Sequence, residues 1–267
     1  MDNSYGLADL HEQLLIIMDD IDRVCKAHDI KYTISDGTLL GAVRHHGFIP
    51  WDDDMDVRML RDDFEKFKTV YEKEKKAGFI IGHPCNLTTY SVINPQYVIS
   101  GAKLKEGTIN NPWISVFPMD SAPESVRMSN IKATGMRLLS GMIGKPPQYA
   151  YFSKKTRIKY AITSFLGRIY GPERARKAFE KKSTSCKDSG SGMVVSYATN
   201  DAKTPYIRYP LKWFENIRDF DFEGRTYYGL ADYDEYLTAV YGADYMTPLP
   251  PDQRKTKHIR MQSEDEE

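Results

Sequence analysis

Cysteine is scarce in this 267-residue sequence, and it has neither a long apolar run nor an excess of charge of either sign. Cys25, Cys85 and Cys186 are widely spaced, which argues against a C-x-x-C zinc site and against a disulfide framework. Lys plus Arg and Asp plus Glu each number 37, so the formal net charge is zero and a nucleic-acid partner is not expected. The first residues lack the apolar core of a signal peptide. We therefore expect a soluble, reduced, cytoplasmic protein.

Apolar residues make up 41% of the chain and aromatic residues 12%, enough for a large hydrophobic core. The 18 tyrosines would suit a binding site for a sugar or a quaternary ammonium group. Tyrosine-rich packing explains them equally well. The composition alone leaves both interpretations open.

Hydrophobic periodicity predicts a mixed α/β arrangement in the first half of the chain. Leu7, Leu10 and Leu14 begin an apolar stripe with alternating spacings of three and four, which indicates a helix over about 7–28. A short β-rich run at 30–35 precedes Asp36-Gly37, and a second strand contains "DMDVRML". A helix is expected in "RDDFEKFKTVYEKEKK", and further strands in "GFIIGH", "YVISGAKL" and "WISVF".

Longer helical patterns follow from about Pro123. They cover roughly 125–142, 156–170 and 173–182, and a hairpin at "FEGRTYYG" and a helix around "DYDEYLTAVYG" come after them. The predicted fold class is α+β: a mixed β-sheet flanked by helices, with a helix-rich C-terminal half. We expect residues 1–122 to form a catalytic core, and residues 123–267 to complete the same domain or a closely packed one.

The acidic segment "WDDDMDV" at 51–57 is the first candidate site. Crowded carboxylates repel one another unless a cation lies among them. An EF-hand loop would need Gly and Glu where this sequence has Val57 and Asp63, so calcium binding of that type is rejected. A solvated acidic loop is the general alternative. The apolar neighbours Phe48 and Trp51 weaken it, because they would bury part of the segment.

Strand alternation would place Asp52, Asp54 and Asp56 on one face, and Asp53 on the other with Met55. Carboxylates at i and i+2 lie ~7 Å apart along a strand, close enough to hold divalent cations between them. Upstream, Gly37 and Thr38 fall at a strand-to-helix turn, where backbone N–H groups can bind a phosphate. This combination is typical of nucleotidyltransferase-type enzymes.

The block "DGTLLGAVRHHGFIPWDDDMDV" closely resembles the signature of the LicD family, bacterial phosphocholine transferases related to fukutin. The resemblance extends to "CKAHDIKYTIS", "RDDFEKF", "AKLKEGT", "VFPMD" and "YGADYMTPLPP". It implies a nucleotidyltransferase-like fold. The implied activity is transfer of a phosphoalcohol, often phosphocholine from CDP-choline, to a sugar hydroxyl of a cell-surface glycan with release of CMP.

The resemblance also assigns roles to residues of the acidic segment. Asp54 and Asp56 match the metal-binding pair and are expected to bind Mg²⁺, with Mn²⁺ as a possible substitute, while Asp52 is a ligand or supports one. Gly37 and Thr38 match the phosphate-facing turn, as substrate-binding residues.

Several basic and aromatic residues are further candidates. Arg44 is placed to contact a phosphate bidentately, or to form a structural salt bridge with the aspartates. Lys103 matches a family lysine and could hold a diphosphate, although an exposed edge-strand lysine is the ordinary alternative. Arg254, followed by Lys255, Lys257 and His258, could bind donor phosphate or anionic glycan, or form a solvated basic tail.

His45 and His46 could supply a general base, but adjacent histidines more often hydrogen-bond structurally. Trp51, Trp113 or Tyr149 could surround a trimethylammonium group, and Trp51 is taken as the substrate-binding candidate.

One departure from the family pattern concerns the metal site. Many relatives have Asp at the first position of "D-I-F-P-L-D", where this chain has Ser115. Serine is a poorer ligand for a hard divalent cation, because it is neutral and offers one oxygen. Asp120 keeps the second Asp of the motif and is a candidate metal ligand or a structural cap. The alternatives for this site are that it depends on Asp52, Asp54 and Asp56, that it binds metal more weakly, or that it has lost some activity.

The expected donor is CDP-choline or a related CDP-alcohol such as CDP-ribitol, CDP-glycerol or CDP-ethanolamine. The expected acceptor is a glycan of the teichoic acid or lipooligosaccharide type, in a lipid-linked form that would allow peripheral association with the inner face of the membrane. A third alternative, raised by Ser115, is a catalytically weak partner subunit that binds nucleotide or glycan.

Overall fold

A computed structural model describes residues 4–83, 87–99, 102–104, 111–145, 153–187, 189–198, 207–256 and 259–261. Of residues 102–104 and 259–261 only the backbone is described. Within these ranges the chain forms a nine-stranded mixed sheet, a two-stranded sheet and eight α-helices. The predicted class, a mixed sheet flanked by helices, is confirmed. Tyr149, Cys85, Lys257, His258 and the acidic tail at 263–267 lie outside the described residues.

The elements follow one another along the chain in this order. The first half contains α1 (Ala8–Ala27), β1 (Thr33–Ile34), α2 (Asp36–His45), β2 (Met55–Leu60), α3 (Arg61–Glu74), β3 (Ile80–Gly82), β4 (Tyr90–Ile93), β5 (Ala102–Leu104) and β6 (Trp113–Ser121). The second half contains α4 (Val126–Ile143), α5 (Lys154–Tyr170), α6 (Pro172–Ser183), β7 (Met193–Val195), β8 (Tyr209–Pro210), α7 (Leu211–Glu215), β9 (Ile217–Phe222), β10 (Arg225–Leu230), α8 (Tyr233–Tyr241), the 3-10 turn η2 (Pro251–Gln253) and β11 (Ile259–Met261).

The large sheet joins the two halves of the chain. Its order is β3-β4-β6-β2-β1-β10-β9, and β7 and β8 extend it from the end of β6. β2 runs parallel to β6, and β1 runs parallel to β10 from the second half. Residues on both sides of the proposed 122/123 boundary therefore share one sheet, and the boundary itself stays a prediction.

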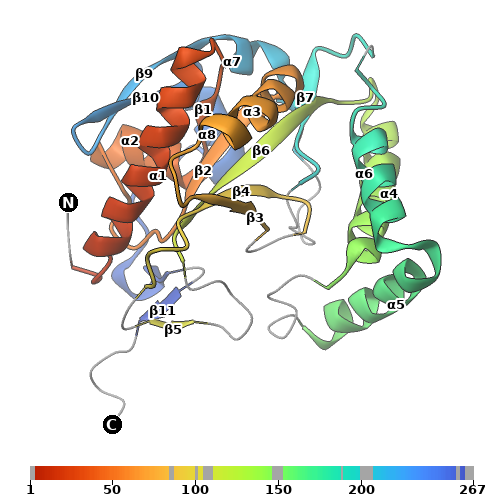
Figure 1. Ribbon diagram of the computed structural model, residues 1–267. Coiled ribbons are helices and arrows are strands. Elements are labelled where there is room, and N and C mark those ends of the chain that lie inside the picture. The colour runs from red at the N-terminus through yellow and green to blue at the C-terminus, as the bar shows by residue number, and fades with distance from the viewer. Residues whose placement is uncertain are drawn as a thin grey trace.

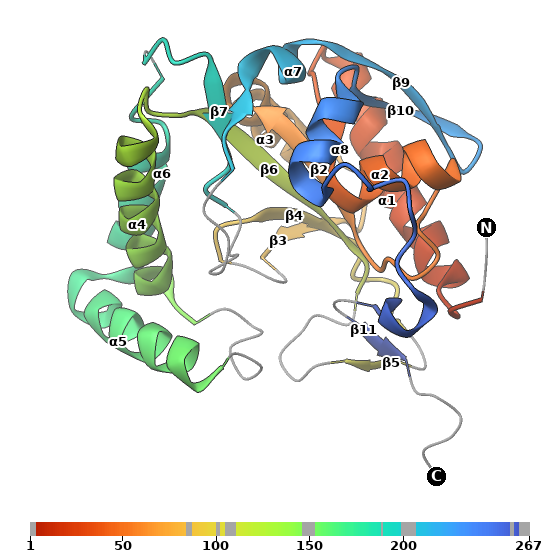
Figure 2. The same ribbon diagram turned by 180° about the vertical axis from the view of Figure 1, so that it is seen from behind.

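One face of the sheet is covered by α1 and α3. Met55, Val57 and Met59 of β2 are fully buried in the same core cluster as the apolar stripe of α1 and as Phe64 and Phe67 of α3. Figure 1 shows α1 and α3 on this face, and Figure 2 shows α7 and α8 on the opposite one. The alternation predicted for β2 thus places its odd-numbered residues in the core and leaves Asp56 on the other face.

The helices α4, α5 and α6 form a separate layer beside the sheet (Figures 1 and 2). This layer has a small core of its own with β6 and β7, which includes Met136, Phe179 and Val195. No helix among the described residues is long and apolar enough to cross a bilayer.

The predicted helices and the β9–β10 hairpin agree with the structure, whereas several short strands do not. β1 has two residues in place of the predicted run over 30–35, and only 102–104 of "YVISGAKL" form a strand. β4, β7, β8 and α7 have no counterpart in the prediction. Each of these elements has at most five residues, and its conformation depends on pairing or packing with distant segments rather than on a local pattern.

Candidate functional site

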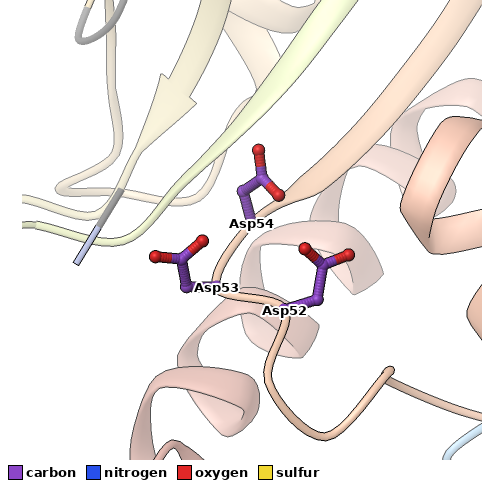
Figure 3. Close-up of side chains that lie close together, drawn as sticks. All are labelled: Asp52, Asp53 and Asp54. Atoms are coloured by element: carbon purple, nitrogen blue, oxygen red, sulfur yellow. The ribbon is translucent and has the colours of Figure 1, made fainter. Parts of the chain in front are cut away.

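Three consecutive carboxylates converge just before β2. Oxygen atoms of Asp52, Asp53 and Asp54 all lie within 4.8 Å of one another (Figure 3). Asp52 and Asp53 are buried and Asp54 is half-buried. β2 begins only at Met55, so the alternation predicted for 52–57 does not apply to Asp53, which joins the cluster instead of pointing away. Such a cluster could bind a metal ion.

The backbone of this acidic turn is fixed from three directions. The Nε2 atom of His11 on α1 lies 2.8 Å from the carbonyl oxygen of Asp52, and the His11 ring stacks on Phe48 with centroids 3.9 Å apart. The amide of Asp52 donates to the carbonyl of Ile49 at 2.9 Å. A Cβ atom added to Gly37 would lie 2.3 Å from Oδ2 of Asp52, so α2 approaches the carboxylate as closely as glycine permits. His11 was not anticipated from the sequence.

Thr38 holds the start of β2 to α2. Its Oγ1 accepts a hydrogen bond from the amide of Asp56 at 2.9 Å, and the carbonyl of Asp56 accepts one from Ser35 at 3.0 Å. The amide of Thr38 donates to the carbonyl of Ser35 at 3.0 Å. The Thr38 amide is therefore occupied within the turn, and its side chain positions the backbone of Asp56.

Asp56 lies in a row of polar side chains across the sheet. It stands beside Ser115 in the β2–β6 register, and Ser115 stands beside Ser91 in the β4–β6 register. Ser91 and Ser115 are buried, and the hydroxyl of Ser91 has no hydrogen-bond partner in the part of the chain that the structure describes. Ser115 thus lies next to Asp56, at the position for which the family resemblance implies a third carboxylate.

Asp120 lies five residues farther along β6 and is not brought to the cluster. Both its oxygens accept hydrogen bonds from Arg61, from Nε and from a terminal nitrogen, each at 2.7 Å. The Asp120 side chain is 1% exposed and that of Arg61 is 17% exposed. This buried ion pair favours the structural alternative for Asp120, and its role as a metal ligand stays a prediction.

Arg44, Arg254 and Trp51 gather beside the acidic cluster. Burial lowers the pKa of Arg44, Tyr241 and Asp52 raise it, and Arg254 lowers it, so these three groups lie within electrostatic reach of Arg44. A terminal nitrogen of Arg44 donates to the carbonyl of Tyr245 at 2.7 Å. The guanidinium of Arg254 lies 4.9 Å from the centre of the Trp51 ring.

Trp51 itself is largely enclosed. Its side chain is 8% exposed, and its ring also contacts Tyr5 at 5.8 Å and His45 at 6.4 Å between centroids. The indole therefore supports Arg254 through a cation–π contact and leaves little surface for a choline group.

The remaining candidates have structural partners or lie outside the description. Nε2 of His45 accepts a hydrogen bond from Nε of Arg44 at 3.0 Å. His46 ends α2 in the left-handed conformation, and its carbonyl accepts a hydrogen bond from the amide of Glu223. Trp113 is 3% exposed. Lys103 pairs with Arg260 in the β5–β11 register, and its side chain is outside the described structure.

A buried ion pair anchors the beginning of α2. Arg58 donates from Nε and a terminal nitrogen to Oδ2 of Asp36 at 3.1 and 2.8 Å, and the hydroxyl of Tyr236 donates to Oδ1 of Asp36 at 2.9 Å. Burial alone would lower the pKa of Arg58, but Asp36 and the neighbouring phenols raise it well above its ordinary value. Asp36 has a positive φ of 50°, so this pairing holds a strained residue directly before Gly37.

Tyr241 at the end of α8 is a site residue that the sequence did not indicate. Its phenol has a raised pKa, first because of desolvation and then because of the carboxylates of Asp36, Asp52, Asp56 and Asp54. The side chain is 39% exposed. It therefore presents a neutral hydroxyl near the aspartates, from a helix almost two hundred residues away in the chain. The motif "YGADYM" contains this tyrosine, but nothing in its spacing distinguishes it.

Comparisons with known proteins match this part of the chain in one case and nearly the whole chain in another. The family described as "LicD/FKTN/FKRP, nucleotidyltransferase domain" matches residues 29–134, which include the acidic turn, Gly37 and Ser115. The chain is 28% identical over 265 residues to the "Lipopolysaccharide cholinephosphotransferase LicD" of Haemophilus influenzae, an alignment that covers 94% of this chain and 96% of that protein. An uncharacterized protein of Rickettsia typhi is 38% identical over 87 residues, 33% of this chain and 25% of that protein.

Proposed function

We propose, on the premise that residues 29–134 form a nucleotidyltransferase domain of the LicD/FKTN/FKRP family, that the chain is a Mg²⁺-dependent phosphotransferase. It would move phosphocholine from CDP-choline to a hydroxyl of a cell-surface glycan precursor and release CMP. The observation that carries this proposal is the convergence of the Asp52–Asp54 carboxylates beside two arginines. The Haemophilus influenzae relative, by its name, transfers cholinephosphate to lipopolysaccharide.

The carboxylates would hold the cation, and the arginines would hold the donor. Asp54 and Asp56 are the proposed metal ligands, supported by Asp52 from the buried side of the turn. A divalent cation bound there would neutralise charge on the diphosphate and on the leaving CMP. Arg44, whose pKa is affected by the charges of both Arg254 and Asp52, and Arg254 are proposed to bind diphosphate oxygens.

Other groups of the chain would orient the reactants. Gly37 brings the amino end of α2 against Asp52, and Thr38 fixes Asp56 through its hydroxyl. Lys103 is proposed as a second diphosphate contact. The neutral Tyr241 hydroxyl can donate a hydrogen bond to a phosphate oxygen beside the aspartates, because its phenolate form is disfavoured.

The test is release of CMP from CDP-choline with a glycan acceptor. Full activity is expected with Mg²⁺ or Mn²⁺, and a loss of at least about a hundredfold in Asp54→Asn and Asp56→Asn, because the ligands of the charge-neutralising cation are removed. Asp219→Asn is a matched control, since Asp219 is an exposed aspartate on β9. CMP release that needs neither the cation nor Asp56 would refute the mechanism.

A different donor alcohol is the second candidate, and the enclosure of Trp51 favours it. With that indole covered by Arg254 and Tyr5, one of the aromatic residues expected around choline is occupied. Parallel incubations with CDP-choline, CDP-ribitol, CDP-glycerol and CDP-ethanolamine, with CMP as the readout, distinguish these donors.

Ser115 favours a third candidate, a nucleotide-binding or glycan-binding subunit with weak catalysis. Its position beside Asp56 leaves a hydroxyl where a carboxylate is expected. If Ser115→Asp raises metal affinity and CMP release together, the site is short of one ligand; if neither changes, Ser115 is compatible with full activity.

A further inference from the structure

The helix α5 has its large apolar side chains on the outside. Exposed fractions are 53% for Ile158, 57% for Ile162, 61% for Phe165, 42% for Leu166 and 73% for Ile169. At 100° per residue these positions share an arc of about 100° of the helix circumference. An amphipathic helix of a globular protein normally turns such a stripe toward the core. The opposite orientation here requires an explanation.

The inner face of α5 shows that this orientation is fixed by close packing. A Cβ atom added to Gly167 would lie 1.9 Å from the carbonyl oxygen of Met142 on α4, and one added to Gly141 would lie 2.3 Å from Oγ1 of Thr163. At these two positions α4 and α5 approach too closely for a side chain larger than that of glycine. Rotating the stripe inward would force isoleucine and phenylalanine into this contact, so the exposed face is a property of the fold.

The charges of the same layer are strongly one-sided. α5 contains Lys154, Lys155, Arg157, Lys159 and Arg168, and no acidic residue. Over residues 126–187 the sequence has fifteen Lys or Arg and two Asp or Glu, a net charge of +13, although the whole chain is neutral. The helices α4, α5 and α6 therefore form a basic layer, although the net charge of the whole chain is zero. Figures 1 and 2 show α5 at the outer end of this layer, away from the large sheet.

We propose that α5 docks on an anionic lipid bilayer, with its apolar stripe in the interface between headgroups and acyl chains and its cations among the lipid phosphates. A basic helix with a wide apolar face binds bilayers through both contributions at once. The proposal does not rest on the identity of the donor or the acceptor.

Two other occupants fit the observations less well. A second copy of this chain would bring two layers of net charge +13 together, which opposes association through the α5 face. A nucleic acid would attract the cations but would leave the Ile and Phe side chains in contact with a polar backbone. An anionic bilayer matches the charge and the apolar stripe together.

Vesicle co-sedimentation of the full chain tests the proposal. Binding is expected to vesicles made of equal parts phosphatidylglycerol and phosphatidylcholine, and it should weaken as salt is raised. Pure phosphatidylcholine vesicles should bind much less. The double variant Phe165→Ser/Ile169→Ser should weaken partition about tenfold or more, because two interfacial side chains are removed.

The charge contribution is tested separately. Lys155→Gln/Lys159→Gln should lower binding roughly tenfold on anionic vesicles, in proportion to the lost lysines. Matched controls are Ile80→Ser on β3 and Lys73→Gln on α3, both exposed residues outside the helical layer, which should bind as the unchanged chain does. Circular dichroism checks that each variant is folded, which is expected because the replaced side chains are exposed.

Three results would overturn the proposal. One is absence of binding to anionic vesicles at low salt. Another is binding that α5 variants and control variants reduce equally. The third is a dimer in analytical ultracentrifugation that Phe165→Ser/Ile169→Ser dissociates, without any vesicle binding, since the occupant would then be a second copy of the chain.

Discussion

Gly37 lies at the start of α2, in contact with the carboxylate of Asp52. The site therefore depends on the absence of a Cβ atom at this position. We expect Gly37→Ala to weaken Mn²⁺ binding at least about tenfold and to destabilise the fold by roughly 1–3 kcal/mol, because the added methyl overlaps Oδ2 of Asp52. Isothermal titration and urea unfolding measure the two effects. Gly135→Ala is the control: its Cβ would meet only the flexible end of Lys182, 2.8 Å away, and alanine favours the helix. An unchanged Gly37→Ala variant would show that Asp52 can move without consequence.

Variants of Asp120 and Asp54 distinguish a residue that stabilises the fold from one that binds metal. We expect Asp120→Asn to cost about 3 kcal/mol, because the largely buried Arg61 loses its buried partner and keeps only the half-exposed Glu65 at 3.0 Å. Its metal affinity should stay close to that of the unchanged chain. Asp54→Asn should instead weaken metal binding and leave the free energy of unfolding nearly unchanged. A metal titration combined with urea unfolding of both variants tests this, and a loss of metal binding in a folded Asp120→Asn protein would support Asp120 as a ligand.

His83 gives the fold a dependence on pH. It is half-buried, and desolvation lowers its pKa below 6.5; the hydrogen bond to the Thr89 carbonyl raises it in part, and the charge of Arg176 lowers it. Because the folded pKa is the lower one, the unfolded chain takes up the proton first. The contribution to stability is complete above about pH 6.5 and is lost as pH falls toward the folded pKa. Urea unfolding measured from above pH 6.5 down into mildly acidic solution should show, for His83→Gln, a shallower dependence of the unfolding free energy on pH.

At the scale of elements, the ion pair of Asp36 with Arg58 joins α2 to β2. Arg58→Met should destabilise the protein by about 3 kcal/mol, since it leaves the Asp36 carboxylate beside buried groups without its cation. The double variant Asp36→Asn/Arg58→Met should lose less than the sum of the single variants, and a double-mutant cycle measures this coupling. Lys187→Met is the control, because the Lys187 and Asp62 side chains are 62% and 78% exposed and their ion pair contributes little. Additive effects would contradict the proposed anchor.

Elements with strong local signals could be predicted, and those that depend on distant partners could not. The stripe of α1 and the Glu223–Gly224 turn between β9 and β10 are local patterns, and both elements form as expected. The acidic turn was identified with Arg44, Arg254 and Trp51 around it, although their roles stay predictions. His11, Tyr241 and the Asp36–Arg58 pair were missed. The hydrogen-bonded residues at these places are 22 to 200 positions apart in the sequence. No short-range sequence pattern predicts such contacts.

At the scale of the whole molecule, the strand pairing indicates whether the chain can be divided into two independently stable parts. Parallel pairing of β1 with β10 brings Ile34 beside Gly229, and the main core contains fully buried residues from both halves, among them Phe222, Leu230 and Tyr236. Residues 1–122 alone would lose this cover and expose the edge of β1. The proposed catalytic core therefore needs the second half of the chain to be stable.

We accordingly expect a fragment of residues 1–122 to lack a cooperative unfolding transition, while the full chain unfolds with its sheet as one unit. The physical reason is that the fragment leaves the apolar face against β9, β10 and α8 in water, and burial of that face is the main favourable term in its folding. Circular dichroism against temperature for the fragment and the full chain measures this, and a fragment of residues 1–245, which keeps all strands of the large sheet and α8, is the control. A cooperative transition in the short fragment would show that the first half folds by itself and would support the boundary at 122/123.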